Sequence, residues 1–502
     1  MPDRVAPLDR PNILFIITDH HAFAHHAAMR SPYMPRFEAF AAQGISFPRA
    51  YTVCPLCSPA RASLMTGMYP SAHGMRWNSD SGICENRNDF AQGQLLFSHY
   101  LSRAGYRNSY VGKWHCGHTR LPSDYGMEGW SLPDYGDVYA TDAYAQYAAE
   151  RGLHEPVARV EHNPRLLERE GNLLRLGQPG PWQLIESSGV MEGLPESHES
   201  FFVAHMAAEK LRQLARAGQP FSLVASFWSP HHPYFPTEPY ASMIDPAGIQ
   251  EYPSFRDSLE GRPIRHFMHR DLHAPSASRW PEWATWRKIL SRCYGQILQL
   301  DAAIGLVLDA LESTGLSENT LVVCCADHGD ALASHGGLWD KSATFTEEVG
   351  RIPLAVRWPA RFRGGRCDAL VSNMDCTATI LEAAGVETPN GMHSRSLIPL
   401  CEDPGSPWPD HLVCEHNGHG EIVMTRILLS GRHKYVAALY DGDELYDLKN
   451  DPYETRNLID DPACGQELAR MRSLLIDHME SRGDSVGRRL LYSVKLKNRE
   501  AR

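Results

Sequence analysis

Five apolar runs rich in β-branched residues constrain the fold of this chain most strongly. They are "NILFIIT", "NSYVG", "FSLVASFW", "LVVCCA" and "IPLAVRW", and polar residues follow each of the first four. Near-continuous apolar runs of this length are typical of strands that are buried on both faces, as in a parallel sheet. Stretches of helical period alternate with these runs, so we expect an α/β fold.

Two amphipathic stretches between the runs predict long helices. "SHESFFVAHMAAEKLRQLARAG" ends at Gly218, and "WRKILSRCYGQILQLDAAIGLVLDALESTG" ends at Gly315. Glycine commonly ends a helix because it adopts the left-handed conformation at low cost. Residues 121–200 and 233–285 are rich in Pro, Gly, Tyr and Trp, and we expect them to form excursions over the sheet and not core elements.

The character of the sequence changes after about residue 400. Shorter alternating segments are separated by "GRH" and "DGD", which resemble hairpin turns and predict a small antiparallel sheet. We therefore expect a catalytic α/β domain at 1–400 and a small C-terminal α+β subdomain with a tail at 401–502. The tail mixes apolar and basic residues, so it either packs on a neighbouring subunit, in a homodimer or homotetramer, or forms a frayed terminus.

Composition excludes several classes of partner. The 502 residues carry a formal net charge of -11, which argues against nucleic acid and anionic membranes as partners. No apolar stretch is long enough to span a bilayer, and the N-terminus lacks the basic start and the cleavage site of a secretory signal. We therefore expect a cytoplasmic protein with no nucleic-acid and no membrane partner.

Charged and polar side chains follow four of the five runs. In α/β folds, ligands bind beyond the carboxyl ends of the strands. The residues at these positions are Asp19 and His20, Lys113 and His115, His231, and Asp327 and His328. They predict one composite active site at a single edge of the sheet.

The segment "VCPLCSPARASLMTG", residues 53–67, contains two closely spaced cysteines. Cys54 and Cys57 have the C-x-x-C spacing of a zinc knuckle or a redox pair, but a knuckle needs a second such pair and the sequence has none. Pro59 and the good helix formers after it predict a helix that begins near Cys57. The backbone N–H groups and the dipole there would stabilise a reactive thiolate or an anionic ligand.

The pattern C-x-P-x-R followed by "ASLMTG" resembles the signature of the type I, formylglycine-dependent sulfatases of the alkaline phosphatase superfamily. Further elements occur in the family's order: "PNILFIITDHH", "VGKWHCG", "SPHHPYFP", "ADHGDALASHGGLWDK" and "ELYDLKNDPYETRNL". The resemblance implies a large mixed, mostly parallel sheet sandwiched by helices, plus a small C-terminal antiparallel sheet. It also implies a sulfuric ester hydrolase that acts on sulfate monoesters, as arylsulfatases do.

In that family the signature cysteine is oxidised to formylglycine, which implies this modification of Cys57 by a formylglycine-generating maturation enzyme. The hydrated aldehyde attacks sulfur with one hydroxyl, and deprotonation of the other hydroxyl expels sulfate. One divalent metal ion lowers the pKa of the nucleophile and neutralises the sulfate oxygens. The implied ligands are Asp19, His20, Asp327, His328 and the oxygen at position 57.

The resemblance also implies roles for five further side chains or groups. Lys113 and Lys341 hold the sulfuryl oxygens and stabilise the charge in transfer. His115 acts as the base toward the second hydroxyl, and His231 as the acid, or hydrogen-bond donor, toward the departing alcohol oxygen. Arg61 holds the modified residue and its loop.

Three residues leave alternatives open. His20 departs from the family, which has a carboxylate or carboxamide oxygen at this position. An oxygen-rich site suits Ca²⁺, whereas an imidazole beside His328 shifts the preference toward Mn²⁺, Zn²⁺ or Fe²⁺. Asn78 is a candidate hydrogen-bond donor to a substrate oxygen, and His335 is either a substrate contact or a loop residue.

Two other functions also stay open, beside hydrolysis of a small anionic sulfate ester. Phosphonate monoester and phosphodiester hydrolases share the formylglycine machinery. Lys113 and His115 favour a sulfatase, while Asn78 and the expected cytoplasmic location favour the phosphonate branch. A non-catalytic metal-binding protein would follow if Cys57 stays a thiol.

Overall fold

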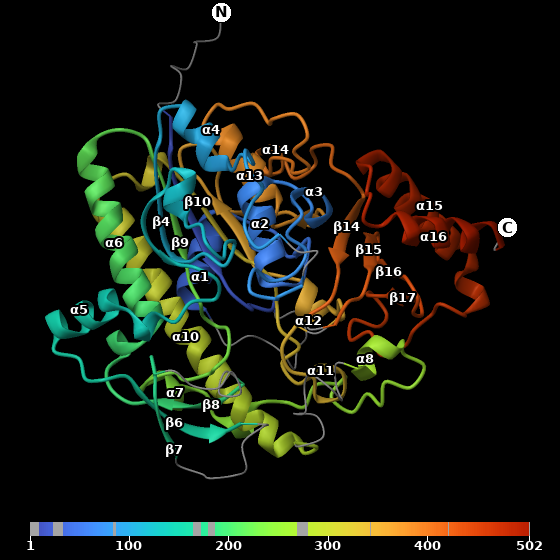
Figure 1. Cartoon of the computed structure of the whole chain (residues 1–502), viewed down its shortest axis with the longest axis horizontal. Coiled ribbons are helices and arrows are strands. Elements are labelled where there is room, and N and C mark those ends of the chain that lie inside the picture. The colour runs from blue at the N-terminus through green and yellow to red at the C-terminus, as the bar shows by residue number, and fades with distance from the viewer. Residues whose placement is uncertain are drawn as a thin grey trace, which may run out of the picture.

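A computed structural model of the chain describes residues 10–23, 34–83, 87–163, 172–178, 186–268, 280–341, 343–419 and 421–500. Its centre is an eight-stranded sheet with the strand order β12-β2-β11-β10-β1-β9-β4-β5 (Figure 1). In chain order these strands are β1 (Asn12–Thr18), β2 (Ile45–Ser46), β4 (Arg107–Lys113), β5 (Glu128–Leu132), β9 (Phe221–Ser226), β10 (Thr320–Ala326), β11 (Leu354–Arg357) and β12 (Gly365–Arg366).

The four runs that precede polar residues form the parallel centre of this sheet. β1 pairs in parallel with both β10 and β9, and β9 pairs in parallel with β4. β11, which contains the fifth run, is antiparallel to β10. The expected mixed, mostly parallel sheet is therefore confirmed, and the carboxyl ends of its central strands lie at one edge.

Alternate side chains of β1 enter two different cores. Leu14 and Ile16 pack on the face covered by α1 (Pro35–Gln43), α6 (Glu199–Ala217) and α10 (Trp283–Ser313). Ile13, Phe15 and Ile17 pack on the opposite face, which is covered by α2 (Cys57–Thr66), α4 (Phe97–Arg103), α13 (Asp375–Ala383) and α14 (Ile398–Glu402) (Figure 1). Burial on both sides explains why the run is apolar throughout.

The two long predicted helices are confirmed. α6 ends at Gly218, whose φ of 70° is left-handed, and α10 ends just before Gly315, whose φ is 72°. Both helices pack side by side on one face of the sheet (Figure 1). Among the described helices, none has the length and apolar character needed to cross a membrane.

The C-terminal part contains the expected antiparallel sheet. Its strands are β14 (His411–His416), β15 (Thr425–Ser430), β16 (His433–Ala438) and β17 (Glu444–Asp447), in that order. α15 (Gly465–Arg482) and α16 (Arg488–Glu500) cover one face. The other face packs against Tyr51, Phe345 and Leu370 of the larger part. A division of the chain at residue 400 stays a prediction.

Residues 121–200 are more regular than predicted. β5 extends the main sheet as an edge strand parallel to β4, so the expectation of no core element here is wrong. α5 (Asp142–Arg151) follows, and β6 (Val157–His162), β7 (Asn172–Arg175) and β8 (Ser188–Met191) form a separate three-stranded sheet. No residue of β5 is fully buried, and this partial exposure explains why the strand lacks a long apolar run.

Short elements connect these units: β3 (Ala50–Tyr51), α3 (Pro70–His73), α7 (Tyr240–Met243), α8 (Ile264–Met268), α11 (Ser334–Gly337), α12 (Glu347–Gly350) and β13 (Val371–Ser372).

Candidate active site

Cys57 is the first residue of α2, and the segment that follows α3 holds this end in place. Asn78 Oδ1 accepts a hydrogen bond from the backbone N–H of Ser58 at 3.1 Å, and Ser58 Oγ accepts one from Ser79 N at 3.0 Å. All ten residues of α2 are buried. Asn78 therefore lies beside position 57, where its oxygen satisfies a backbone donor at the helix start.

His328 faces Cys57 with one ring nitrogen. Its Nε2 is 3.1 Å from Cys57 Sγ, while its Nδ1 is 2.8 Å from the carbonyl oxygen of Gly329. Because Nδ1 donates to that carbonyl, the lone pair of Nε2 is directed at position 57. Burial lowers the pKa of His328, so the imidazole is neutral and suited to bind a metal ion.

Asp19 and Asp327 follow the adjacent parallel strands β1 and β10. Asp327 Oδ1 accepts hydrogen bonds from the backbone N–H groups of His20 at 3.2 Å and His328 at 2.8 Å, and Oδ2 accepts one from Arg61 Nε at 2.8 Å. Asp19 Oδ2 pairs with Lys113 Nζ. Asp19 Oδ1 is buried and has no hydrogen-bond partner among the described residues. Arg61 Nη2 lies 3.8 Å from this oxygen, beyond hydrogen-bond distance. A buried carboxylate oxygen without a hydrogen bond fits a cation.

The two carboxyl groups differ in their pKa values. Burial alone would raise the pKa of Asp19, but Lys113 and Arg61 hold it well below its usual range. Burial and the negative charge of Asp19 raise the pKa of Asp327. A divalent ion between these side chains would stabilise both carboxylates.

A possible set of metal ligands follows from these positions. Ligand atoms of Asp19, His20, Cys57 and His328 all lie within 4.8 Å of one another. Burial lowers the pKa of His20 well below its usual range. Its Nδ1 is 3.3 Å from Asp330 Oδ2, and its Nε2 is 2.6 Å from Lys341 Nζ. Asp19 Oδ1 and His328 Nε2 therefore fit a divalent cation best, because both nitrogens of His20 already have protein partners.

Three buried cations surround the carboxylates. Lys113 ends β4 and pairs with Asp19, and Lys341 Nζ is 2.9 Å from Asp340 Oδ1. Burial would lower the pKa of Lys341, but Asp340 raises it, so the ammonium stays charged. Arg61 Nη1 donates to the carbonyl oxygen of Lys113 at 3.1 Å and ties α2 to β4. Together these groups can hold a tetrahedral anion.

His115 is buried, but its ring nitrogens lack the hydrogen bonds that buried polar groups usually make in the described chain. Its backbone has a φ of 51°, which is left-handed and unusual for a residue other than glycine. Its side chain is 2% exposed, and neither ring nitrogen has a hydrogen-bond partner among the described residues. Asp80 Oδ1 is 3.9 Å from its Nε2. Such an imidazole is available to a ligand.

His231 lies between this cluster and a cavity. Its Nδ1 is 2.6 Å from the carbonyl oxygen of His232 and 3.2 Å from the hydroxyl of Tyr135. Its ring centroid is 3.8 Å from that of His20. Burial lowers the pKa of His231 well below its usual range. Because Nδ1 donates to the backbone, Nε2 is the nitrogen left for a substrate.

The structure places His335 in a second buried cluster. Its Nε2 is 3.2 Å from Glu348 Oε2, and its Nδ1 is 3.7 Å from Asp257 Oδ2. Burial would lower the pKa of His335, but Glu348 and Asp257 raise it to about 9. The side chain is therefore part of an ion-pair network, and its role as a substrate contact stays a prediction.

The sequence analysis missed several residues that complete the site. Asp330 binds His20, and Asp340 binds Lys341. Their positions three residues after Asp327 and directly before Lys341 are signals that could have found them. Tyr135 contacts His231 and lies under Lys113, whose Nζ is 4.1 Å from the ring centroid. The aromatic composition of its segment was the only signal for Tyr135.

Family models match nearly the whole chain. The model described as sulfatase matches residues 11–386, which include every residue of the cluster. The chain belongs to the sulfatase family. The protein is thus a sulfuric ester hydrolase of the alkaline phosphatase superfamily, as the sequence analysis predicted. The model described as N-sulphoglucosamine sulphohydrolase, C-terminal, matches residues 334–481 of this sulfatase.

Individual relatives and solved structures agree with this family. The sulfatase is 29% identical over 477 residues to the uncharacterized sulfatase YidJ of Escherichia coli, covering 94% of this chain and 88% of that one. It is 26% identical over 502 residues to an arylsulfatase of Clostridium perfringens, covering 96% and 97%. A phosphonate monoester hydrolase from Silicibacter pomeroyi has a TM-score of 0.76 at 22% identity, covering 95% and 96%, which supports the fold.

Proposed function

We propose that this sulfatase hydrolyses small sulfate monoesters with formylglycine at position 57 and one divalent metal ion. One observation carries the proposal. Position 57 lies 3.1 Å from the free nitrogen of His328, beside a buried Asp19 oxygen that has no hydrogen-bond partner among the described residues. Lys113, Lys341 and Arg61 lie around this point, where they pair with Asp19, Asp340 and Asp327.

Three side chains would hold the metal ion. Ligand atoms of Asp19 and His328 lie within 4.8 Å of each other and of Cys57. Asp327 Oδ1 accepts from two backbone N–H groups and lies 3.9 Å from His328 Nε2, and it would bind the ion through a remaining lone pair. His20 would join them only if Lys341 moved away from its Nε2. A carboxylate oxygen and an imidazole nitrogen together are compatible with Ca²⁺ or Mn²⁺, and also with Zn²⁺ or Fe²⁺.

The modified residue and the metal together supply the nucleophile: a hydrated aldehyde oxygen whose pKa the metal lowers. A separate maturation enzyme, which would supply the oxidant, would convert the Cβ of Cys57 to the aldehyde, and the sulfur would leave as sulfide. The net reaction adds water across the S–O bond of the ester and gives sulfate and an alcohol.

The lysines would bind the sulfate group. The ammonium groups of Lys113 and Lys341 are both buried, so their attraction for a sulfuryl oxygen is screened little by solvent. Lys113 forms an ion pair with Asp19, and Lys341 forms one with Asp340. These ion pairs fix the two ammonium groups before the substrate binds. Donors fixed in this way stabilise the charge that moves onto the oxygens during transfer.

The two histidines would move protons on opposite sides of the sulfur atom. His115 has both ring nitrogens free of hydrogen bonds within the described chain, so it can take a proton, and Asp80 would stabilise the resulting cation. His231 would donate to the departing alcohol oxygen through Nε2. The negative charge of the sulfate group favours protonation of His231, against the effect of burial.

A comparison of two ester classes tests this function. Protein with verified conversion at position 57 and measured metal content would be assayed with an aryl sulfate and with the matching aryl phosphonate monoester. We expect the higher kcat/KM for the sulfate, because the Lys113 ammonium can bind the sulfuryl oxygens and His115 can take the proton from the second hydroxyl. Cys57→Ala is the control for background hydrolysis. A higher kcat/KM for the phosphonate monoester would contradict the proposal. The cytoplasmic location and the homodimer or homotetramer stay predictions.

A further inference from the structure

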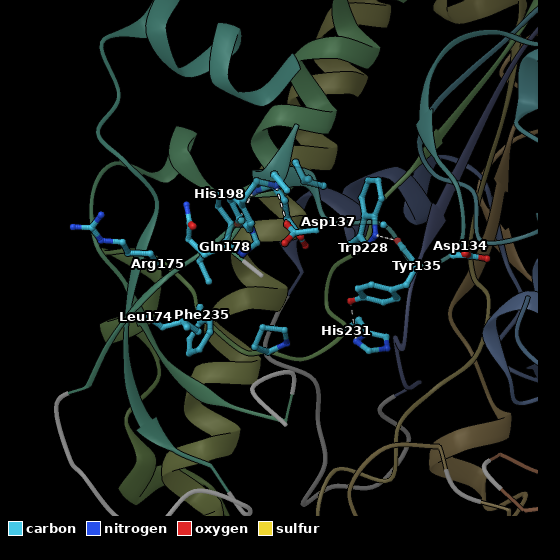
Figure 2. Close-up of a pocket in the computed structure, with 18 of the residues that line it drawn as sticks. Asp134, Tyr135, Asp137, Leu174, Arg175, Gln178, His198, Trp228, His231 and Phe235 are labelled. Carbon is cyan, nitrogen blue, oxygen red and sulfur yellow. Dashed lines mark hydrogen bonds between the residues drawn. The ribbon is translucent and has the colours of Figure 1, made fainter. Parts of the chain in front are cut away.

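A cavity of about 560 Å³ begins where the proposed leaving group would depart. Tyr135 and His231 form its inner end, and Leu174 and Phe235 lie at the other side (Figure 2). The hydroxyl of Tyr135 is 3.2 Å from His231 Nδ1. His115, whose buried ring nitrogens have no hydrogen-bond partner within the described chain, lies beside Tyr135 with ring centroids 5.8 Å apart. If the proposed function holds, the alcohol part of the substrate occupies this cavity.

Carboxylic acids dominate the charged lining. Asp80, Asp134, Asp137 and Glu199 line the cavity, against the single guanidinium of Arg175. The Arg175 side chain is 68% exposed and lies 3.5 Å from Glu155. Figure 2 shows it directed away from His231, at the outer side of the cavity. Asp134 pairs with His118 at 2.6 Å, and Asp80 lies 3.9 Å from His115 Nε2, which leaves Asp137 and Glu199 as the candidate ligands of a cation.

Asp137 and Glu199 have no ion-pair partner among the described residues. Asp137 Oδ1 accepts a hydrogen bond from Tyr139 N at 3.0 Å, and Glu199 Oε1 accepts one from Ser229 Oγ at 2.9 Å. These bonds fix the two carboxyl groups but do not neutralise them. Burial raises the pKa of Glu199 to about 7, and the negative charge of Asp137 adds to the rise. A cation between the two groups would relieve this unfavourable pairing.

The uncharged lining is largely aromatic. Tyr135, Tyr139, Trp228 and Phe235 all line the cavity. Trp228 Nε1 donates to the carbonyl oxygen of Tyr135 at 2.7 Å, so these two rings are held together. The faces of aromatic rings attract ammonium groups, and the attraction is strongest where the cation is desolvated.

We propose that the alcohol part of the substrate carries an ammonium group, which binds between Asp137, Glu199 and the aromatic walls of this cavity. A second sulfate or a carboxylate on the alcohol would meet the same acids and be repelled. The inference rests on the proposed function, because it assigns the cavity to the leaving alcohol.

Three aryl sulfates of similar size test the inference. They carry an aminoethyl, a hydroxyethyl or a carboxymethyl group para to the sulfate, so that the three phenols leave with similar ease. We expect kcat/KM for the ammonium ester to exceed that for the hydroxyethyl ester about tenfold, with the carboxymethyl ester lowest. Added salt should reduce the ratio between the ammonium and hydroxyethyl esters.

A pair of matched variants locates the effect. Asp137→Asn keeps an oxygen that accepts from Tyr139 N and removes only the charge, so the ratio of kcat/KM between the ammonium and hydroxyethyl esters should fall toward one. Asp142→Asn makes the same change in the first turn of α5, outside the cavity, and should keep the wild-type ratio. Thermal unfolding of both variants shows whether either change has disturbed the fold.

The outcomes separate this inference from the function on which it rests. Equal kcat/KM for the three esters, or a higher value for the carboxymethyl ester or for a neutral sugar sulfate, would overturn the inference. An unchanged ratio in a folded Asp137→Asn variant would do the same. If converted, metal-loaded protein hydrolyses none of these esters and no nitrophenyl sulfate either, the proposed function fails as well.

Discussion

Tyr135 contacts two regions whose charged groups differ, because its ring lies 4.1 Å from Lys113 Nζ and its side chain also lines the cavity. On one side lie the cations Arg61, Lys113 and Lys341, all of which have buried side chains. On the other side, the cavity is lined by acids such as Asp137 and Glu199. On the function that we propose, the sulfate group would bind beside these cations and the alcohol would bind in the cavity.

The two regions also differ in how the chain builds them. The cationic side is attached to the central strands, since Asp19 follows β1 and Lys113 ends β4. The acidic side comes mainly from the excursion at residues 121–200, which includes Tyr135 and Asp137. A rigid sheet edge suits the chemistry that all substrates share, and connecting segments suit the recognition of particular alcohols.

Removal of the Lys113 ammonium should have the largest effect on this arrangement. Lys113→Met removes a buried cation that pairs with Asp19, and kcat/KM should fall about a hundredfold or more for every ester. Steady-state kinetics with a neutral aryl sulfate measure the loss. Lys210→Met, on the outer part of α6 and paired at 4.0 Å with Glu128, is the matched control and should keep wild-type kinetics. A folded Lys113→Met variant with near-normal kcat/KM would remove this residue from the sulfate site.

Removal of the Asp19 charge from the proposed metal site should have the second-largest effect. Asp19→Asn removes the charge of the buried carboxylate whose Oδ1 lacks a hydrogen-bond partner in the described chain. Metal affinity should then fall about tenfold to a hundredfold, and kcat with it at limiting metal. Metal analysis after dialysis provides a readout that is independent of activity. Retention of stoichiometric metal by this variant would assign the ligands elsewhere.

A smaller effect is expected at the boundary between the two regions. Tyr135→Phe keeps the ring under Lys113 but removes the hydroxyl that lies 3.2 Å from His231 Nδ1. We expect kcat to fall about threefold to tenfold, because one hydrogen bond that orients His231 is lost. The loss should be larger for esters of poor leaving groups, which need the acid more. Equal losses for good and poor leaving groups would contradict a link through His231.

The smallest expected effect is a change with pH in the ratio of kcat/KM between the ammonium and hydroxyethyl esters. Burial, Asp137 and Asp19 raise the pKa of Glu199 to about 7, while Ser229 and Lys113 act in the opposite direction. Glu199 therefore gains its negative charge as the pH rises through about 7. The kcat/KM ratio of ammonium to hydroxyethyl ester should rise over this range, and Glu199→Gln should abolish the rise. A ratio that falls with pH would contradict the assignment.

The sequence predicted the cationic side far better than the acidic side. Asp19 and Asp327 directly follow buried strands and Lys113 ends one, so a single rule about parallel sheets brings them together. Glu199 begins α6 and Asp137 lies in a segment without apolar periodicity, so only tertiary packing shows that both line one cavity. His335 lies close in sequence to Lys341, but its left-handed backbone takes the side chain to Asp257 and Glu348.

The mass of the tryptic peptide 50–61 tests the central claim most directly, because Arg49 and Arg61 bound the segment that contains Cys57. Protein produced together with a formylglycine-generating enzyme should give a peptide about 18 Da lighter than the cysteine form. The converted fraction should be proportional to kcat for an aryl sulfate. Full sulfatase activity in protein whose residue 57 is entirely unmodified cysteine would contradict the account.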